Sequence, residues 1–296
     1  MRINQNISAM NTQASMVRSD NAISKSLERL SSGLRINRAA DDAAGLAISE
    51  KMRGQIRGLK QAARNAQDGI SLIQTAEGAL NETHSIVQRM RELAAQAAND
   101  TLTDSDRQEI QKEINQLTQE VDRIAATTEF NTKKLLRGTT NASGNYVSGT
   151  LTLTMHIGAN KGQTMTVTIG NMDTGTLKIG LTSGGSGVAA GTDAYKGLDV
   201  STQSGANKAI ETYDTALSTI SSERAKLGAY QNRLEHTISN LDTARENLSA
   251  SESRIRDVDM AEEMANFSRA QILMQASTAM MAQANAKPQA VLKLLS

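Results

Sequence analysis

The side chains best suited to chemistry are few in this sequence, and they lie far apart. The three histidines are His84, His156 and His236, and none has a second histidine at the spacing of a metal-binding pair. No HExxH, no GxSxG and no phosphate-binding loop of glycines followed by lysine occurs. The sequence therefore predicts helix-surface positions for His84 and His236, and the polar face of a strand for His156.

Two pairs of adjacent carboxylates, Asp41-Asp42 and Glu262-Glu263, are the next candidates. Neighbouring residues point to different sides of a helix, so we predict helix caps or solvated faces rather than acid–base pairs. The chain has no cysteine, which excludes disulfides and thiolate metal sites. The prediction is a protein that is not an enzyme, with no catalytic residues, cofactor or metal.

The charge and hydropathy of the chain also argue against nucleic-acid-binding and membrane proteins. The net charge is +1, from 32 basic and 31 acidic residues, which gives no general attraction to nucleic acid or to an anionic membrane. No stretch approaches the roughly 18 apolar residues of a membrane span, and the N-terminus lacks the apolar core of a secretory signal. Read from the residues alone, the chain is predicted to be cytosolic, with neither nucleic acid nor membrane insertion among its partners.

Long helices are the elements that this sequence predicts most clearly. Apolar residues recur seven apart from Tyr213 to Ile255 and from Met52 to Ala94, which keeps one apolar seam on each helix. Thr103 and Asp106 form a capping arrangement that would start a third helix. The predicted core of this bundle is Leu59, Ile73, Leu80, Val87, Ile110, Ile114, Leu117, Val121, Ile220, Leu227, Leu234, Leu241 and Leu248.

The middle of the chain differs in composition. Thirteen of the 21 glycines lie between residues 138 and 197. Residues 151–157 and 165–169 alternate apolar and polar side chains around a turn at 158–162, which predicts a β-hairpin that caps one end of the bundle. A weaker strand is predicted at 176–181 and a flexible loop at 183–191.

Both ends of the chain carry helices with a thin apolar stripe. Residues 1–34 bury too little apolar surface to order alone, so we predict disorder until a partner docks, with a break at Ser31-Ser32-Gly33. Near the C-terminus the pattern has a seven-residue period, and Pro288 is predicted to stop the last helix. Five of the 13 methionines fall in the last 37 residues, and they either fill gaps in a seam or form an adaptable partner surface.

A possible protein-binding patch is indicated beside the second helix. Val87, Met90 and Ala94 belong to its seam, so Arg89 and Leu93 are predicted to share an outward face. An exposed leucine beside arginines, with Glu113 on the next helix, suits a protein contact. An ordinary solvated face is the alternative.

Several motifs resemble those of bacterial flagellins. They are Ser31–Asn37 with Ala39–Ile48, Gln88–Asn99, Ile157–Asn160, Arg224–Leu234, Ser253–Asp259 and Ala282–Asn285. The likeness covers about residues 1–135 and 205–296 together with the hairpin. The middle is too short for large outer domains, so the chain resembles the compact type with only the two inner domains.

The resemblance implies a structural subunit that self-assembles into the flagellar filament for motility, exported unfolded through the type III route without a cleaved signal. This extracellular location replaces the cytosolic prediction. The implied partners are other copies of the chain, an export chaperone on the C-terminal segment, the filament cap and hook-associated proteins, and a host's Toll-like receptor 5. The residues carried over for the receptor are Gln88, Arg89, Leu93, Glu113 and Gln116.

The expected architecture is mainly α, a long coiled-coil bundle with a small β-hairpin insert. Residues 1–42 and 255–296 would pair as a coiled coil in the filament, 43–138 and 200–254 would form the bundle, and 139–199 the attached insert. The predicted polymerisation residues are Ile3, Ile7, Met10, Val17, Ile23, Leu27, Leu30, Phe267, Met274, Met281, Leu292 and Leu295.

Three alternatives share parts of this pattern. A hook–filament junction protein has similar termini and would differ in not forming long filaments by itself. A coiled-coil signalling hairpin like the cytoplasmic part of a chemoreceptor is disfavoured by the Gly/Thr-rich insert and the lack of a membrane span. A metallopeptidase inserted in the middle, as some flagellins carry, would need the missing HExxH.

Overall fold

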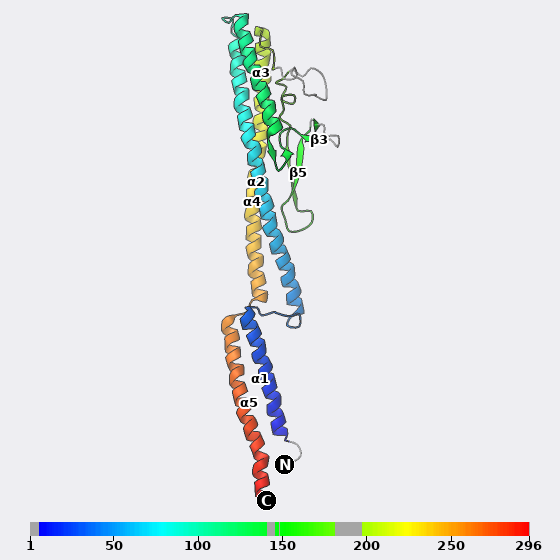
Figure 1. Cartoon of the computed structure of the whole chain (residues 1–296), viewed down its shortest axis with the longest axis vertical. Helices are drawn as coiled ribbons and strands as arrows, with labels where there is room; N and C mark the ends of the chain where they lie inside the picture. The colour runs from blue at the N-terminus through cyan, green and yellow to red at the C-terminus, as the bar shows by residue number, and fades with distance from the viewer. Residues whose placement is uncertain (1–5, 141–145, 148, 181–196, 296) are drawn as a thin grey trace. The chain divides into compact units, whose positions relative to one another are not determined.

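The computed structural model describes residues 6–140, 146–147, 149–180 and 197–295 (Figure 1). Its helices are α1 (Ile7–Ser32), α2 (Ala43–Ala97), α3 (Asp104–Thr127), α4 (Gln203–Arg256) and α5 (Met260–Leu295). Its strands are β1 (Glu129–Phe130), β2 (Lys133–Lys134), β3 (Thr139–Thr140), β4 (Tyr146–Val147), β5 (Leu151–His156) and β6 (Thr164–Ile169). The predicted fold class, a mainly helical chain with a small β-hairpin, is confirmed.

The chain divides into two compact units. Met1–Arg57 and Ala244–Ser296 form the terminal unit, and Gly58–Thr243 form the bundle unit. The sequence predicts domain boundaries near the start of α2 and the end of α4. The two compact units instead meet within these helices, at residues 57–58 and 243–244. None of the helices in the described residues has the length and apolar character that crossing a membrane requires.

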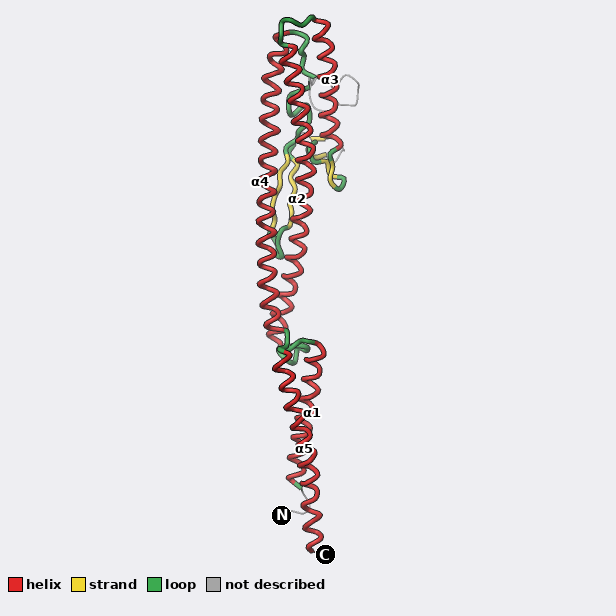
Figure 2. Tube along the Cα trace, turned by 90° about the vertical axis from the view of Figure 1, so that its left-hand side faces the viewer, coloured by secondary structure: helices red, strands yellow, loops and turns green. Residues whose placement is uncertain are grey.

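In the bundle unit, α2, α3 and α4 lie side by side (Figures 1 and 2). Arg91 of α2 pairs with Asp214 of α4, and Glu77 with Arg224, so α2 and α4 run antiparallel. Of the predicted core, the buried residues are Leu59, Ile73, Leu80, Val87, Ile110, Ile114, Val121, Ile220, Leu227, Leu234 and Leu241, while Leu117 and Leu248 are half-buried.

The start of α3 is held as its sequence predicts. Thr103 is the N-cap, and it exchanges both hydrogen bonds of a capping box with Asp106. Arg107, one residue later, is buried, which no sequence pattern predicts. Its Nε donates to the carbonyl of Ala97 at 3.1 Å and its terminal nitrogen to that of Asn99 at 3.2 Å. Arg107 thus satisfies carbonyls that the end of α2 leaves without helical partners.

The hairpin formed by β5 and β6 is antiparallel, with pairs that run from Leu151 and Ile169 to His156 and Thr164. It lies along α2 and α4, so the prediction that it caps one end of the bundle is wrong (Figure 2). Asn65 of α2 donates to the carbonyl of His156 at 2.9 Å. A flank position lets the whole apolar face of the strands pack on the helices, whereas an end position would leave most of it in water.

Two details of this region differ from the sequence prediction. Residues 176–178 form a turn rather than a strand, because Asp173 accepts hydrogen bonds from the main-chain N–H groups of Thr176 at 2.7 Å and Leu177 at 3.0 Å. Among the described residues, the only β-pairing of the strand predicted at 176–181 is an isolated bridge between Gly180 and Gly197. The flexible loop predicted at 183–191 lies outside the described residues.

The terminal unit pairs α1 with α5. Asn6 donates to the carbonyl of Ala284 at 2.9 Å and Ser26 to Glu263 at 2.6 Å, so the helices are antiparallel. The partner that docks on α1 is therefore α5 of the same chain. The predicted break occurs at Gly33, which caps α1 with φ 70°.

The last helix does not stop at Pro288 as predicted but continues to Leu295. A proline removes one main-chain donor and strains the preceding turn, yet it does not by itself end a helix. The residues around it include strong helix formers such as alanine, glutamine and leucine, which favour continuation.

Candidate functional site

The α1–α5 contact is a coiled-coil seam built largely from small side chains. On α5 the buried or half-buried positions include Glu263, Phe267, Ala270, Met274, Ser277, Met281 and Ala284, and on α1 they include Ala9, Thr12, Met16, Ser19, Ile23, Ser26 and Leu30. Both sets alternate spacings of three and four residues, which keeps each set on one face of its helix. Alanine, serine and threonine make up about half of the seam, so this contact buries little apolar surface.

Three large apolar residues in the N-terminal half of α1 point away from this seam. Ile7, Met10 and Val17 are 58%, 64% and 52% exposed, and their spacing places them on one side of the helix. We call these three residues the outward stripe. The sequence predicts one thin apolar stripe on α1, whereas the structure has two faces. Towards α5, small residues are mixed with Met16, Ile23 and Leu30, and towards solvent lies the outward stripe.

The other predicted polymerisation residues divide between these environments. Ile23, Leu30, Phe267, Met274 and Met281 are half-buried in the seam, and Leu27 is exposed. Ile3 lies outside the described residues, as do the side chains of Leu292 and Leu295.

On α5, sequence reasoning missed exposed Ile272 and Leu273. The departure of Ile272 from the seven-residue pattern of the seam could have indicated its outward position, whereas Leu273 lies beside the seam.

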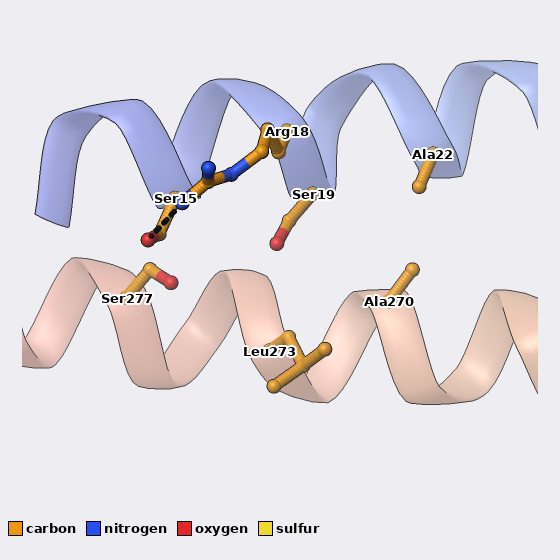
Figure 3. Close-up of a pocket in the computed structure, with 7 residues that line it drawn as sticks. All are labelled: Ser15, Arg18, Ser19, Ala22, Ala270, Leu273 and Ser277. Atoms are coloured by element: carbon orange, nitrogen blue, oxygen red, sulfur yellow. Dashed lines mark hydrogen bonds between the residues drawn. The ribbon is translucent and has the colours of Figure 1, made fainter. Parts of the chain in front are cut away.

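A groove of about 360 Å³ opens where α1 and α5 face one another. It is lined by Ser15, Arg18, Ser19, Ala22, Ala270, Leu273 and Ser277 (Figure 3). Arg18 donates to the Ser15 hydroxyl at 3.1 Å, along its own helix rather than across the groove. Because short side chains face one another here, the pair leaves space between its helices.

A buried polar contact joins the same two helices. Ser26 and Glu263 are each 6% exposed, and the Ser26 hydroxyl donates to the Glu263 carboxylate. Arg29 adds an ion pair to the same carboxylate at 3.4 Å. The solvated face predicted for Glu262-Glu263 is therefore wrong for Glu263, because α5 turns this side chain towards α1. A buried polar group is satisfied in one alignment only, so it favours one register of the helices.

Glu263→Ala is expected to weaken the α1–α5 pair by about 3 kcal/mol, because the substitution leaves Arg29 without its buried partner. Hydrogen exchange of the α1 main-chain amides measures this change. The matched control replaces all three polar residues, as Ser26→Ala, Arg29→Leu and Glu263→Leu, and is expected to keep the protection within about 1 kcal/mol. An equal loss of protection in both variants would contradict the argument.

The segments that follow α1 and α4 are tied to one another. Arg35 donates from its main-chain N–H to the carbonyl of Arg256 at 2.7 Å, and Val258 donates to Gly33 at 3.0 Å. Asp41 accepts hydrogen bonds from two main-chain N–H groups and pairs with Lys25 at 2.8 Å. The Lys25 ammonium and these N–H groups lower the pKa of Asp41 to about 2.

The patch predicted beside α2 is only partly at the surface. Gln88, Arg89, Glu113 and Gln116 are exposed, and Arg89 donates to the Glu113 carboxylate at 3.1 Å. Leu93 is 2% exposed, so the prediction that it faces solvent is wrong. Because α2 has α3 and α4 as neighbours, its buried sector is wider than a single seam.

The residues that sequence analysis considered for chemistry do not come together. His156 and His236 are exposed and His84 is half-buried. The described residues contain no group of three histidine, aspartate or glutamate side chains placed to hold a metal ion.

Comparisons with known proteins agree with this architecture. The family model for the bacterial flagellin N-terminal helical region matches residues 3–141, and that for the C-terminal helical region matches residues 210–295. A protein of Bacillus subtilis (strain 168) named flagellin is 53% identical over 306 aligned residues, covering 100% of both chains. The flagellar filament 31.3 kDa core protein of Treponema maltophilum is 50% identical over 297 residues, again covering 100% of both.

A solved structure shares the fold. It is a putative flagellar hook-associated protein from Vibrio parahaemolyticus, with a TM-score of 0.57 and 15% sequence identity. The match covers 73% of the present chain and 100% of that one. At this identity the likeness concerns the fold alone.

Proposed function

The chain belongs to the bacterial flagellin family and is a structural subunit of the extracellular flagellar filament, and from this premise we propose which of its surfaces build the filament. The observation that carries the proposal is the outward stripe. Three large apolar side chains are more than half exposed on the side of α1 that does not contact α5. A second copy of the chain is the partner that would cover them.

Apolar burial supplies the driving force for this contact. Full burial of a valine, isoleucine or methionine side chain stabilises a contact by about 1.5–3 kcal/mol. The outward stripe, together with exposed Ile272 and Leu273 of α5, is thus a self-assembly surface. Because neighbouring subunits bind the ordered form of α1 and α5, filament growth also stabilises the terminal helices.

The proposed domains keep the boundaries that the sequence predicts. Residues 1–42 and 255–296 form the inner part, which becomes fully ordered between neighbouring subunits. Residues 43–138 and 200–254 form a bundle that folds in the monomer, and residues 139–199 form the insert attached to it. The extensive buried core of α2, α3 and α4 supports a bundle that is stable alone.

Relatives that match over the full length at about 50% identity favour a filament subunit over a hook–filament junction protein. The role is structural rather than enzymatic. Growth of long filaments from purified protein on filament seeds, seen by electron microscopy, separates a filament subunit from a junction protein.

We propose that the chain is exported unfolded through the flagellar type III route. Its partners on this route are an export chaperone that binds the C-terminal segment, and then the filament cap and hook-associated proteins. Exposed Met260, Met264 and Met280 on α5 support a chaperone contact, since methionine adapts to differently shaped partners.

In a host, the proposed partner is Toll-like receptor 5. Gln88, Arg89, Glu113 and Gln116 would contact the receptor directly, and buried Leu93 would hold α2 in place beneath them. The mutual ion pair of Arg89 and Glu113 supports a preformed polar patch on α2 and α3.

Hydrogen exchange tests the assembly proposal. Main-chain amides of α1 and α5 are expected to exchange much faster in the monomer than in the filament, because only the filament covers the outward stripe. Amides of the bundle core, such as those around Leu80 and Ile220, are the internal control and are expected to be protected in both states. Equal protection of α1 and α5 in the monomer and the filament would contradict the proposal.

A further inference from the structure

We propose that Met10, Met260, Met264 and Met280 are sites of reversible oxidation to methionine sulfoxide, and that this modification keeps an unassembled subunit out of the filament. The inference rests on the proposed assembly role of the terminal helices. It adds a chemical modification that would set whether a subunit is competent to assemble.

Accessibility separates these four methionines from others in the chain. They are 64%, 49%, 48% and 59% exposed, in the order named. Met90, Met165 and Met172 of the bundle unit are 0%, 1% and 4% exposed. One molecule therefore carries the same thioether in accessible and inaccessible positions, and the accessible positions named here all lie on α1 and α5.

The register of α1 and α5 groups these sulfur atoms at two levels of the terminal unit. The hydrogen bond from Asn6 to Ala284 places Met10 at the level of Met280. The hydrogen bond from Ser26 to Glu263 places Met260 and Met264 near the other end of the pair. Met10 also belongs to the outward stripe, so an oxidised sulfur there would lie on the surface that a second copy must cover.

The reaction needs a two-electron oxidant such as hydrogen peroxide. The thioether sulfur attacks one peroxide oxygen, the O–O bond breaks, and the sulfur is oxidised to the sulfoxide while the remaining oxygen leaves as water. The chain has no cysteine, so no thiol competes for the oxidant. Methionine sulfoxide reductases reverse the change with electrons from a dithiol, which makes the modification reversible.

Oxidation raises the free-energy cost of burying these side chains on assembly. The sulfoxide oxygen is a strong hydrogen-bond acceptor that water solvates, whereas the thioether is apolar. When a second subunit covers it without offering a donor, this solvation is lost. Oxidised monomers are therefore expected to join poorly, and subunits already in a filament, whose stripe is covered, are expected to resist oxidation.

The test treats full-length monomer with hydrogen peroxide and maps the sulfoxides by peptide mass spectrometry. Met10, Met260, Met264 and Met280 are expected to oxidise on the order of tenfold faster than Met90, Met165 and Met172. Growth of the oxidised monomer on filament seeds is expected to fall on the order of tenfold or more, and a methionine sulfoxide reductase is expected to restore it. Uniform oxidation of all seven methionines, or unimpaired growth after oxidation, would overturn the proposal.

The matched variant is Met10→Leu, Met260→Leu, Met264→Leu and Met280→Leu, which keeps the apolar surface and removes the sulfur. It is expected to grow equally well with and without peroxide, and a loss after peroxide equal to that of the wild type would refute the assignment. Reductase rescue of the wild type remains decisive where the variant itself grows poorly. Untreated wild-type protein on the same seeds tests the assembly role separately, since its failure to grow would reject the proposed function rather than the modification.

Discussion

Changing the outward stripe to glutamine, as Ile7→Gln, Met10→Gln and Val17→Gln, is expected to abolish filament growth and leave the monomer folded. The three side chains are 58%, 64% and 52% exposed, so their replacement removes little from the monomer. Each apolar side chain left uncovered in an intersubunit contact costs about 1 kcal/mol or more. Three such losses total about 3 kcal/mol, which raises the subunit concentration needed for growth by more than about 100-fold.

Seeded growth followed by light scattering and electron microscopy measures this effect. Ser8→Gln with Asn11→Gln is the matched control, because both residues are exposed on α1 outside the outward stripe. The control is expected to grow like the wild type. Normal filaments from the triple variant would show that the contacts between copies lie elsewhere, and an altered melting curve of the triple variant would point to a folding defect instead.

Arg107→Ala is expected to lower the free energy of unfolding of the bundle unit by about 3 kcal/mol. The side chain is 10% exposed and donates to the carbonyls of Ala97 and Asn99 where α2 ends, with Asp104 as an additional partner at 3.2 Å. Removing the guanidinium leaves these carbonyls without their charged donor and opens a cavity at the corner between α2 and α3. Urea unfolding followed by circular dichroism measures the loss.

The variant Arg107→Lys distinguishes the contribution of the positive charge to stability from that of the planar guanidinium group. Lysine keeps the positive charge but has no planar fork to reach two carbonyls and a carboxylate at once. An intermediate loss is therefore expected for lysine, smaller than that for alanine. If the alanine variant unfolds at the same urea concentration as the wild type, Arg107 does not hold this corner together.

The helices could be predicted because their determinants are local. The seven-residue recurrence from Tyr213 to Ile255 needs only neighbours along the chain to be recognised, and it corresponds to α4 (Gln203–Arg256). The capping box of Thr103 and Asp106 is equally local, and α3 begins directly after it. The alternation in residues 151–157 and 165–169 predicted β5 and β6 for the same reason.

The errors concern which neighbour covers which side of a helix. A single seam on α2 predicts an exposed Leu93, but α2 packs against two other helices and buries it. The sequence predicts a cap or a solvated face for Glu263, whereas α5 turns this side chain towards Ser26. The burial of Arg107 has no local sequence signal, because its carbonyl partners lie at the end of another helix.

The amino-acid sequence by itself determined that this chain forms long helices with a short β-hairpin insert, since periodicity and capping are properties of a few consecutive residues. Only the tertiary structure decided that Ile7, Met10 and Val17 of α1 point away from α5 and that the hairpin lies along the helices. Both depend on how helices far apart in the chain share their faces, and a periodic pattern shows that a stripe exists without specifying its partner.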